Sequence, residues 1–344
     1  MGTNAGNNNT SEGGGNTFVG WSAGAGATSA DESTFMGSRA GENALGVNNS
    51  FFGVSAGQFS SAGNGNVFFG NSSGKDNTGN YNTFVGRNSG ENNTADKNTF
   101  IGENSGQNNT SGRRNVFVGS SSGIANTVSN DLTFIGFEAG FNNTTGRSNF
   151  FSGSQAGFTN TTGTNNSFMG YQSGFFNDRG NYNTFTGSGS GHGNINGEEN
   201  SFFGYNAGNT LTAGKSNTFI GNSSGSTVSS GTNITLIGSN STSTSGLSNA
   251  IAIGAGTDVR FNNHLILGNN DIKVGIGLSG DPTGPTAPLE INTSGTNLSG
   301  LKFTDLKATS PTSVSNVTKV LTLNNGGDVI WGEIPIGTGP LLHN

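Results

Sequence analysis

The residues that most often carry catalysis or bind metals are few in this chain and far apart. The three histidines are His192, His264 and His343, and the adjacent carboxylates Asp31-Glu32 and Glu198-Glu199 lie in polar segments typical of solvated turns. Hydrolysis of a glycosidic bond needs two carboxylates that face that bond, and the spacing indicates no such pair. The sequence contains no cysteine, which excludes a thiolate metal site. We therefore expect no enzymatic activity, no metal and no cofactor.

Aromatic residues are the better candidates for ligand binding. Trp21, Phe137, Tyr171 and Tyr205 each directly follow a glycine that recurs every 16 or 17 residues. On an outer surface, such rings stack on the apolar faces of sugars. The alternative is that they pack over neighbouring parts of the fold. In the first case, a surface glycan or a host receptor is the expected ligand.

A repeat of 16 or 17 residues positions these aromatic residues and runs through most of the chain. A fixed period of this kind is typical of solenoids, in which each repeat is one structural unit. The motif Asn-Thr-Phe-Val-Gly closes on a glycine, called here the anchor glycine, at Gly20, Gly37, Gly53, Gly70, Gly86, Gly102, Gly119, Gly136, Gly153, Gly170, Gly187, Gly204 and Gly221. A phenylalanine stands two residues before it, at Phe18, Phe35, Phe51, Phe68, Phe84, Phe100, Phe117, Phe134, Phe151, Phe168, Phe185, Phe202 and Phe219.

Each copy of the motif predicts one short β-strand, because Thr-Phe-Val is β-branched and aromatic and is bounded by Asn and Gly. Neither face of the strand is plainly polar, which suits a parallel strand covered on both sides. The small residue and second glycine that follow, as in Ala23-Gly24, predict a second short strand where another backbone comes close. The asparagine before the strand predicts a ladder of hydrogen-bonded amides along the stack.

The expected fold is all-β: a parallel β-roll or β-solenoid with coils of 16 or 17 residues. Burial of each phenylalanine contributes roughly 2 kcal/mol, whereas ordering the backbone costs roughly 1–2 kcal/mol per residue. A coil this thin holds little besides its own strands, so we expect several chains to share a core. A homotrimer is the expected assembly.

The segment Asn249-Ala250-Ile251-Ala252-Ile253-Gly254 resembles the repeat in the heads of trimeric autotransporter adhesins, and the phenylalanine-rich copies resemble repeats of bacterial surface proteins and phage-like fibres. The resemblance covers residues 16 to about 270. It implies a left-handed, homotrimeric β-roll in which the central strand residue, here phenylalanine, faces the threefold axis. The alternative is that phenylalanine fills each chain's own coil. This sequence differs from the adhesin heads in its longer coils and in having phenylalanine where alanine usually stands.

Four segments are expected along the chain. Three prolines in seven residues end the solenoid, since proline cannot donate to a strand ladder. Near the C-terminus, Lys319 to Leu323 and Asp328 to Trp331 flank Asn-Asn-Gly-Gly and predict a β-hairpin. The region from Val274 to Trp331 resembles the connector that precedes an endosialidase-type intramolecular chaperone in fibre proteins. The segments are 1–15, a cap or disordered lead; 16–270, the repeat shaft; 271–292, a transition; and 293–344, a small β-rich module.

The charge and hydropathy of the chain argue against two classes of partner, nucleic acid and the membrane interior. A net charge of −6 without a basic patch disfavours nucleic acid, and no apolar run is long enough to span a membrane. The expected function is a structural or adhesive fibre, located outside the cell on a bacterial surface or on a phage-like appendage. The alternative is a tail fibre of a phage or contractile injection system that recognises a receptor. A polysaccharide-cleaving tail spike and an ice-binding protein are weaker alternatives, the latter because Val67 and Val116 interrupt the threonine column.

Overall fold

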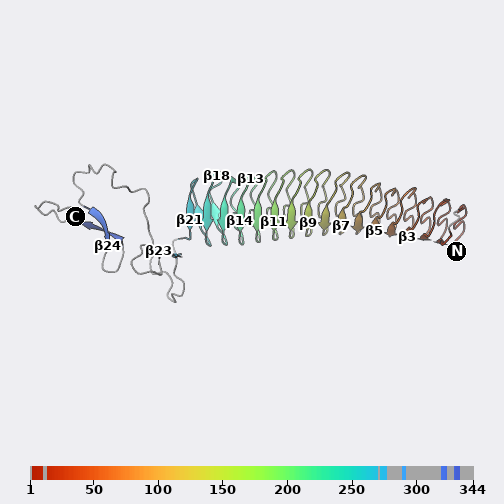
Figure 1. Cartoon of the computed structure of the whole chain (residues 1–344), viewed down its shortest axis with the longest axis horizontal. Helices are drawn as coiled ribbons and strands as arrows, with labels where there is room; N and C mark the ends of the chain where they lie inside the picture. Colours follow the sequence, from red (N-terminus) through yellow and green to blue (C-terminus); the bar gives the residue numbers. More distant parts are fainter. Residues whose placement is uncertain are drawn as a thin grey trace, which may run out of the picture. The chain divides into compact units, whose positions relative to one another are not determined.

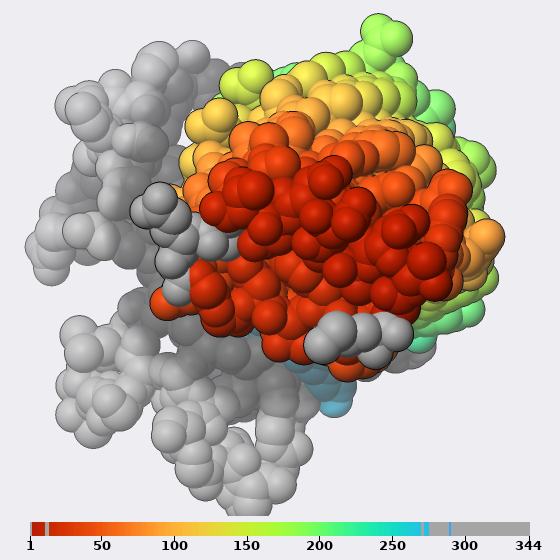
Figure 2. All heavy atoms as spheres, turned by 90° about the vertical axis from the view of Figure 1, so that its right-hand side faces the viewer, coloured from red at the N-terminus to blue at the C-terminus, as the bar shows by residue number. Residues whose placement is uncertain are grey.

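A computed structural model describes residues 2–10, 14–269, 272–276, 289–291, 319–323 and 329–333. The chain forms two compact units, Met1–Val274 and Gly275–Asn344. In the first unit the chain winds into a stack of coils, here called the shaft, and successive coils place their strands side by side (Figure 1). Seen from its N-terminal end, the first coils cover most of the later ones (Figure 2). The predicted all-β parallel solenoid is confirmed.

One parallel sheet of 16 strands runs the length of the shaft. Its strands pair in register, so that Phe35 lies beside Phe18 on one side and beside Phe51 on the other. Each repeat position therefore becomes a row of side chains along the sheet. The strands are β1 (Thr17–Val19), β2 (Thr34–Met36), β3 (Ser50–Phe52), β4 (Val67–Phe69), β5 (Thr83–Val85), β6 (Thr99–Ile101), β7 (Val116–Val118), β8 (Thr133–Ile135), β9 (Phe150–Ser152), β10 (Ser167–Met169), β11 (Thr184–Thr186), β12 (Ser201–Phe203), β14 (Thr218–Ile220), β16 (Thr235–Ile237), β19 (Ile251–Ile253) and β21 (Leu265–Leu267).

The phenylalanine row fills the interior of the chain's own coils. Neighbouring rings stack with their centroids between 4.6 and 5.2 Å apart. A ring without accessible surface in a single chain has none left for a second chain, so the expectation that these rings face a threefold axis is wrong. The alternative, that they fill each chain's own coil, is what the structure has. Phe18 at the end of the row is partly buried, and the fully buried rings are Phe35, Phe51, Phe68, Phe84, Phe100, Phe117, Phe134, Phe151, Phe168, Phe185, Phe202 and Phe219.

Two rows of buried asparagine complete this interior. The first precedes the strands, as predicted: the backbone N–H of Asn66 donates to Oδ1 of Asn49 (2.9 Å), and its Nδ2 donates to the carbonyl of Gly79 (3.0 Å). The second row lies seven residues after the anchor glycine. There Nδ2 of Asn93 donates to Oδ1 of Asn77 (2.7 Å), and the same bond recurs on the following coils. Burying an unpaired amide is costly, and the identical amide of the next coil supplies the partner.

The segment after each strand of the regular shaft is a turn, not the predicted second strand. Its second glycine, for example Gly41, takes a left-handed conformation (φ 56°). A Cβ at Gly41 would overlap the ring of Phe35. The close neighbour that requires glycine is therefore the phenylalanine inside the coil, and it is not the backbone of another strand.

The coils change toward the C-terminal end of the shaft. Leu236, Ala252 and Ile266 continue the phenylalanine row. A second parallel sheet appears there, visible as further arrows beside the main sheet (Figure 1). The added strands are β13 (Ala213–Lys215), β15 (Ser230–Thr232) and β18 (Leu247–Ser248), with a separate pair β17 (Thr242–Ser243) and β20 (Asp258–Val259).

At the N-terminal end, residues 2–10 lie on the first coil. The N–H of Gly6 donates to the carbonyl of Ala23 (2.9 Å), and the N–H of Asn8 donates to the carbonyl of Ala25 (3.1 Å). These bonds follow the pattern between successive coils. The N-terminal residues therefore continue the stack by part of a turn.

Beyond the shaft, the described residues form two strand pairs. β22 (Val274–Ile276) pairs with β23 (Leu289–Ile291), and β24 (Lys319–Leu323) pairs antiparallel with β25 (Val329–Glu333). The predicted hairpin is confirmed in its strand pairing. The three prolines of the predicted transition and most of residues 293–344 lie outside the described residues.

Candidate functional site

The histidines do not form a common site. The ring of His192 lies on the coil surface, where it stacks on Phe175 (centroids 5.3 Å apart) and meets Phe176 edge-on (5.0 Å). Burial against these rings lowers the pKa of His192 below its usual value. His264 is exposed on a later coil, and His343 lies outside the described residues. Within the described ranges, no three His, Cys, Asp or Glu side chains are grouped so that they could hold a metal ion.

The carboxylates of Glu198 and Glu199 pair with Lys215 on the next coil, whose Nζ lies 3.5 and 3.1 Å from their oxygens. The hydroxyl of Ser216, which donates to Glu199, and then Lys215 lower the pKa of Glu199. The pair Asp31-Glu32 is in a turn segment. These contacts make Glu198 and Glu199 part of a surface ion-pair network, an arrangement that contributes little to stability at exposed positions.

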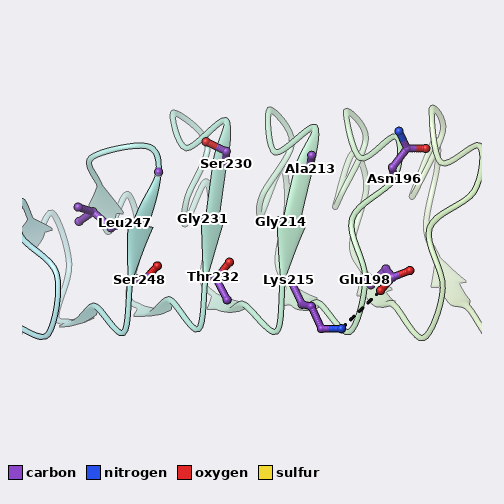
Figure 3. Close-up of a pocket in the computed structure, with 11 residues that line it drawn as sticks. Asn196, Glu198, Ala213, Gly214, Lys215, Ser230, Gly231, Thr232, Leu247 and Ser248 are labelled. Atoms are coloured by element: carbon purple, nitrogen blue, oxygen red, sulfur yellow. Dashed lines mark ion pairs between the residues drawn. The ribbon is translucent and has the colours of Figure 1, made fainter.

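The ion pair of Lys215 borders a shallow depression of about 420 Å³ over β13, β15 and β18 (Figure 3). Small residues such as Gly214, Gly231 and Ser248 make up most of its lining. It contains no aromatic ring, and its one cationic side chain is already paired with two carboxylates. This depression therefore lacks the groups that would hold a specific ligand.

The four predicted ligand-binding aromatics all lie on the outside of the coils. Their exposed fractions are 47% for Trp21, 50% for Phe137, 55% for Tyr171 and 56% for Tyr205. Trp21 is partly covered, because the guanidinium carbon of Arg39 lies 4.8 Å from its ring centroid. We call the row formed by the residues directly after the anchor glycines the corner row.

Tyr171 and Tyr205 of the corner row border one depression of about 290 Å³, called here the notch. The two tyrosines are two coils apart. The N–H of Gly189 donates to the carbonyl of Tyr171, and the N–H of Asn206 donates to the carbonyl of Ser188, both at 2.9 Å. Ser188 therefore takes the corner-row position on the coil between the two tyrosines. The other lining residues are Gln172, Ser188, Gly189, His192, Asn206 and Asn209.

Beside its two tyrosine rings the notch has polar side chains, and no carboxylate, lysine or arginine is among its lining residues. Its only histidine has a lowered pKa, so the imidazole is neutral near pH 7. Oδ1 of Asn209 is buried, and no group of the described residues donates a hydrogen bond to it. A buried acceptor without a donor costs roughly 1–3 kcal/mol.

Sequence reasoning identifies the two tyrosines of the notch but misses its polar residues. The available signal is a departure from the repeat: Ser188-Gly189 stands where the flanking coils have Tyr171-Gln172 and Tyr205-Asn206. A second missed feature is a surface row of stacked rings, Phe141, Phe158, Phe175 and His192, with centroids 5.0, 5.0 and 5.3 Å apart. This row ends at the notch, because the next coil has Asn209 at that position.

The outer face of the main sheet is the second surface of interest. None of its 16 strands contains a charged residue. The row directly before the anchor glycines, called here the outer stripe, is apolar except at Ser152 and Thr186. Its most exposed members are Val19, Met36, Phe69, Ile101, Ile135, Met169, Phe203, Ile220, Ile237, Ile253 and Leu267, with between 36% and 58% of their surface accessible.

Comparisons with protein-family models, with curated proteins and with solved structures yield no match for this chain. Across the residues that the structure describes, no helix has the length and apolar character needed to cross a membrane.

Proposed function

We propose that the chain is a fibre module that assembles with two further copies of itself through the outer stripe. In this proposal the assembly is a left-handed homotrimer outside the cell, where it serves adhesion or attachment. The observation that carries the proposal is the outer stripe, a row of exposed apolar side chains along a sheet of 16 strands. Large exposed apolar surfaces mark interaction sites.

The size of the outer face supports a stable contact. Sixteen strands at the usual spacing give a length of about 70 Å. With a width of about 10 Å, the face covers on the order of 700 Å², close to the roughly 800 Å² that each partner buries in a standard interface. The absence of charged residues from the strands means that no ion has to lose its water when the face is covered.

A second copy of the chain is the partner that fits this face best. The side chains of the stripe repeat at the strand spacing of about 4.8 Å, and an identical rod has the same spacing over the same length. Rotation about an axis parallel to the shaft sets each coil opposite its own copy, so that Met169, for example, meets Met169. The polar interruptions Ser152 and Thr186 would then also meet their own copies.

The molar mass of the full chain in solution tests the proposal. By light scattering and native mass spectrometry we expect three chain masses for the natural sequence. The double substitution Ile101→Glu and Ile135→Glu places two carboxylates in the stripe, and we expect it to give single chains with an unchanged β-sheet circular dichroism spectrum.

Val128→Glu is the matched control, since Val128 is as exposed as Ile135 (38% and 40%) but lies outside the strands of the sheet. We expect this variant to keep the mass of the natural protein. A natural protein that is monomeric at micromolar concentration contradicts the proposal, as does a double variant that keeps three chains.

A further inference from the structure

The corner row alternates between aromatic and small residues over five coils. It reads Phe137, Ser154, Tyr171, Ser188 and Tyr205. Coils directly bonded to each other lie about 4.8 Å apart, so rings on every second coil are separated by about 9.6 Å. Inside the coils, phenylalanine rings stack one per coil with centroids near this spacing, for example 4.8 Å between Phe134 and Phe151. Each gap in the corner row therefore has the height of one missing ring.

The two gaps between neighbouring aromatic residues differ in what fills them. Beside Ser154, the side chain of Gln155 donates through Nε2 to Oε2 of Glu138 (2.9 Å) and accepts at Oε1 from Nε2 of Gln172 (2.8 Å). Beside Ser188 the corresponding residue is Gly189, which has no side chain. The chain of side-chain hydrogen bonds ends there, and the notch opens.

The groups around the notch suit a neutral ligand that has both an apolar face and hydroxyl groups. Tyr171 and Tyr205 offer ring surface that is more than half exposed. Ser188, Asn206 and Asn209 offer hydroxyl and amide groups, and the Oδ1 atom of Asn209 has no donor among the described residues. The volume of about 290 Å³ is at the lower end of ligand pockets, which are roughly 300–1,000 Å³.

We propose that the notch binds one pyranose ring of a neutral saccharide, stacked between Tyr171 and Tyr205 in the place of the missing ring. The Ser188 hydroxyl and the side-chain amides of Asn206 and Asn209 face the sugar hydroxyls. A charged sugar is disfavoured, because no lining residue supplies an opposite charge. The inference adds a ligand to the proposed fibre and does not require three chains, since every lining residue belongs to a single chain.

Saturation-transfer NMR on the full chain tests this site. The probes are the methyl glycosides of glucose, galactose, mannose and N-acetylglucosamine, with methyl glucuronide and p-cresol as an acidic sugar and a planar aromatic. We expect at least one neutral glycoside to bind with a roughly millimolar dissociation constant, because an open site of this size makes few contacts. Tyr205→Ala should weaken that binding about tenfold through the loss of ring stacking.

Ser188→Tyr is the decisive variant, because it supplies the missing ring from the chain itself. The flanking coils carry tyrosine at the same repeat position, so the backbone accommodates it. We expect Ser188→Tyr to abolish glycoside binding while the melting temperature stays unchanged or rises. Ser154→Tyr is the matched control, which fills the other gap and should leave binding intact.

The outcomes separate this inference from the fibre proposal. If no neutral glycoside binds at tens of millimolar, or if binding survives Ser188→Tyr, the site assignment is wrong whatever the molar mass of the protein. Tighter binding of p-cresol than of every glycoside overturns the saccharide and assigns the notch to aromatic ligands. Should Ser188→Tyr fail to fold, Asn209→Leu removes one side-chain amide from the lining without adding bulk, and unchanged affinity in that variant also contradicts the proposal.

Discussion

Phe134 and Phe137 lie three residues apart on the same coil and belong to different parts of the molecule. Phe134 is fully buried between the rings of Phe117 and Phe151, whereas Phe137 is half exposed in the corner row. The inner ring recurs on every coil of the regular shaft, because each copy has the next copy as its packing partner. The outer ring recurs on every second coil, and only from Phe137 to Tyr205. The interior of a solenoid is therefore constrained by repetition, whereas the outside tolerates departures from the repeat.

The largest expected difference in stability is between a variant that lacks an inner ring and a variant that lacks an outer ring. Phe134→Ala leaves a cavity in a continuous stack and should lower the free energy of unfolding by about 3–5 kcal/mol. Phe137→Ala removes a ring that is half exposed and should lower it by only about 1 kcal/mol. Urea denaturation followed by circular dichroism measures both. If both variants lost the same free energy of unfolding, the inner and outer rings would contribute equally to stability, which would contradict this distinction.

A smaller difference in the free energy of unfolding is expected within the interior, when an asparagine in the middle of the second row is replaced rather than the asparagine at its end. Asn126 donates through Nδ2 to Oδ1 of Asn109 (2.7 Å) and accepts from Nδ2 of Asn143 (3.3 Å). Asn126→Leu leaves Oδ1 of Asn109 without this donor, whereas Nδ2 of Asn143 keeps its bond to the carbonyl of Gly146 (3.1 Å). Asn194 ends the row, and its Oδ1 has no hydrogen-bond partner among the described residues. Each orphaned buried group costs roughly 1–3 kcal/mol.

Asn126→Leu should therefore lower the free energy of unfolding by about 1–3 kcal/mol. Asn194→Leu should cost less than about 1 kcal/mol, because the acceptor that it orphans on Asn177 is offset by the unpaired acceptor that it removes. The next coil already has Leu211 at this position, so leucine fits the space. Denaturation midpoints of the two variants, measured side by side, check the order. A larger loss for Asn194→Leu would contradict the account of the amide row.

The repeat allows the strands, their parallel register and the phenylalanine row to be predicted from sequence, because all three follow from a period that is visible in single residues. The direction in which the phenylalanines point was harder to predict. A three-residue strand has two faces, and neither is charged, so the pattern of Thr-Phe-Val does not distinguish the inside of a coil from a contact between chains. The adhesin resemblance favoured the wrong side.

The second asparagine row could not be predicted from the sequence, for a different reason. Three of its members follow another asparagine, and in Asn92-Asn93 and Asn108-Asn109 only the second residue is buried. The conformation of the turn decides which one faces inward, and composition does not reveal it. The notch could likewise be predicted only in part. Tyr171 and Tyr205 can be recognised as candidates from the sequence. The gap that the small residues Ser188-Gly189 leave between them becomes apparent only when the coils are stacked.

The smallest expected effect concerns His192, the outer ring that titrates. Because burial lowers its pKa in the folded protein, the unfolded chain takes up the proton first as the pH falls. The contribution to stability is therefore full above about pH 6.5 and decreases as the pH drops below that value. His192→Phe continues the row of Phe141, Phe158 and Phe175 without a titrating group. The pKa values of Asp96, Asp131 and Glu199 are also lowered, but these carboxylates lose their contribution only below about pH 4.5.

The difference in melting temperature between His192→Phe and the natural protein should thus be constant from pH 8 to 6.5 and widen in favour of the variant toward pH 5. His192 is only partly buried, so the widening should not exceed about 2 °C. His264 and His343 are present in both proteins and cancel in the difference. Thermal scans at half-unit steps of pH check the shape of the curve. A difference that stays flat from pH 8 to 5 would mean that the His192 ring is as well solvated as an exposed histidine, and that the outer row of rings does not shield it.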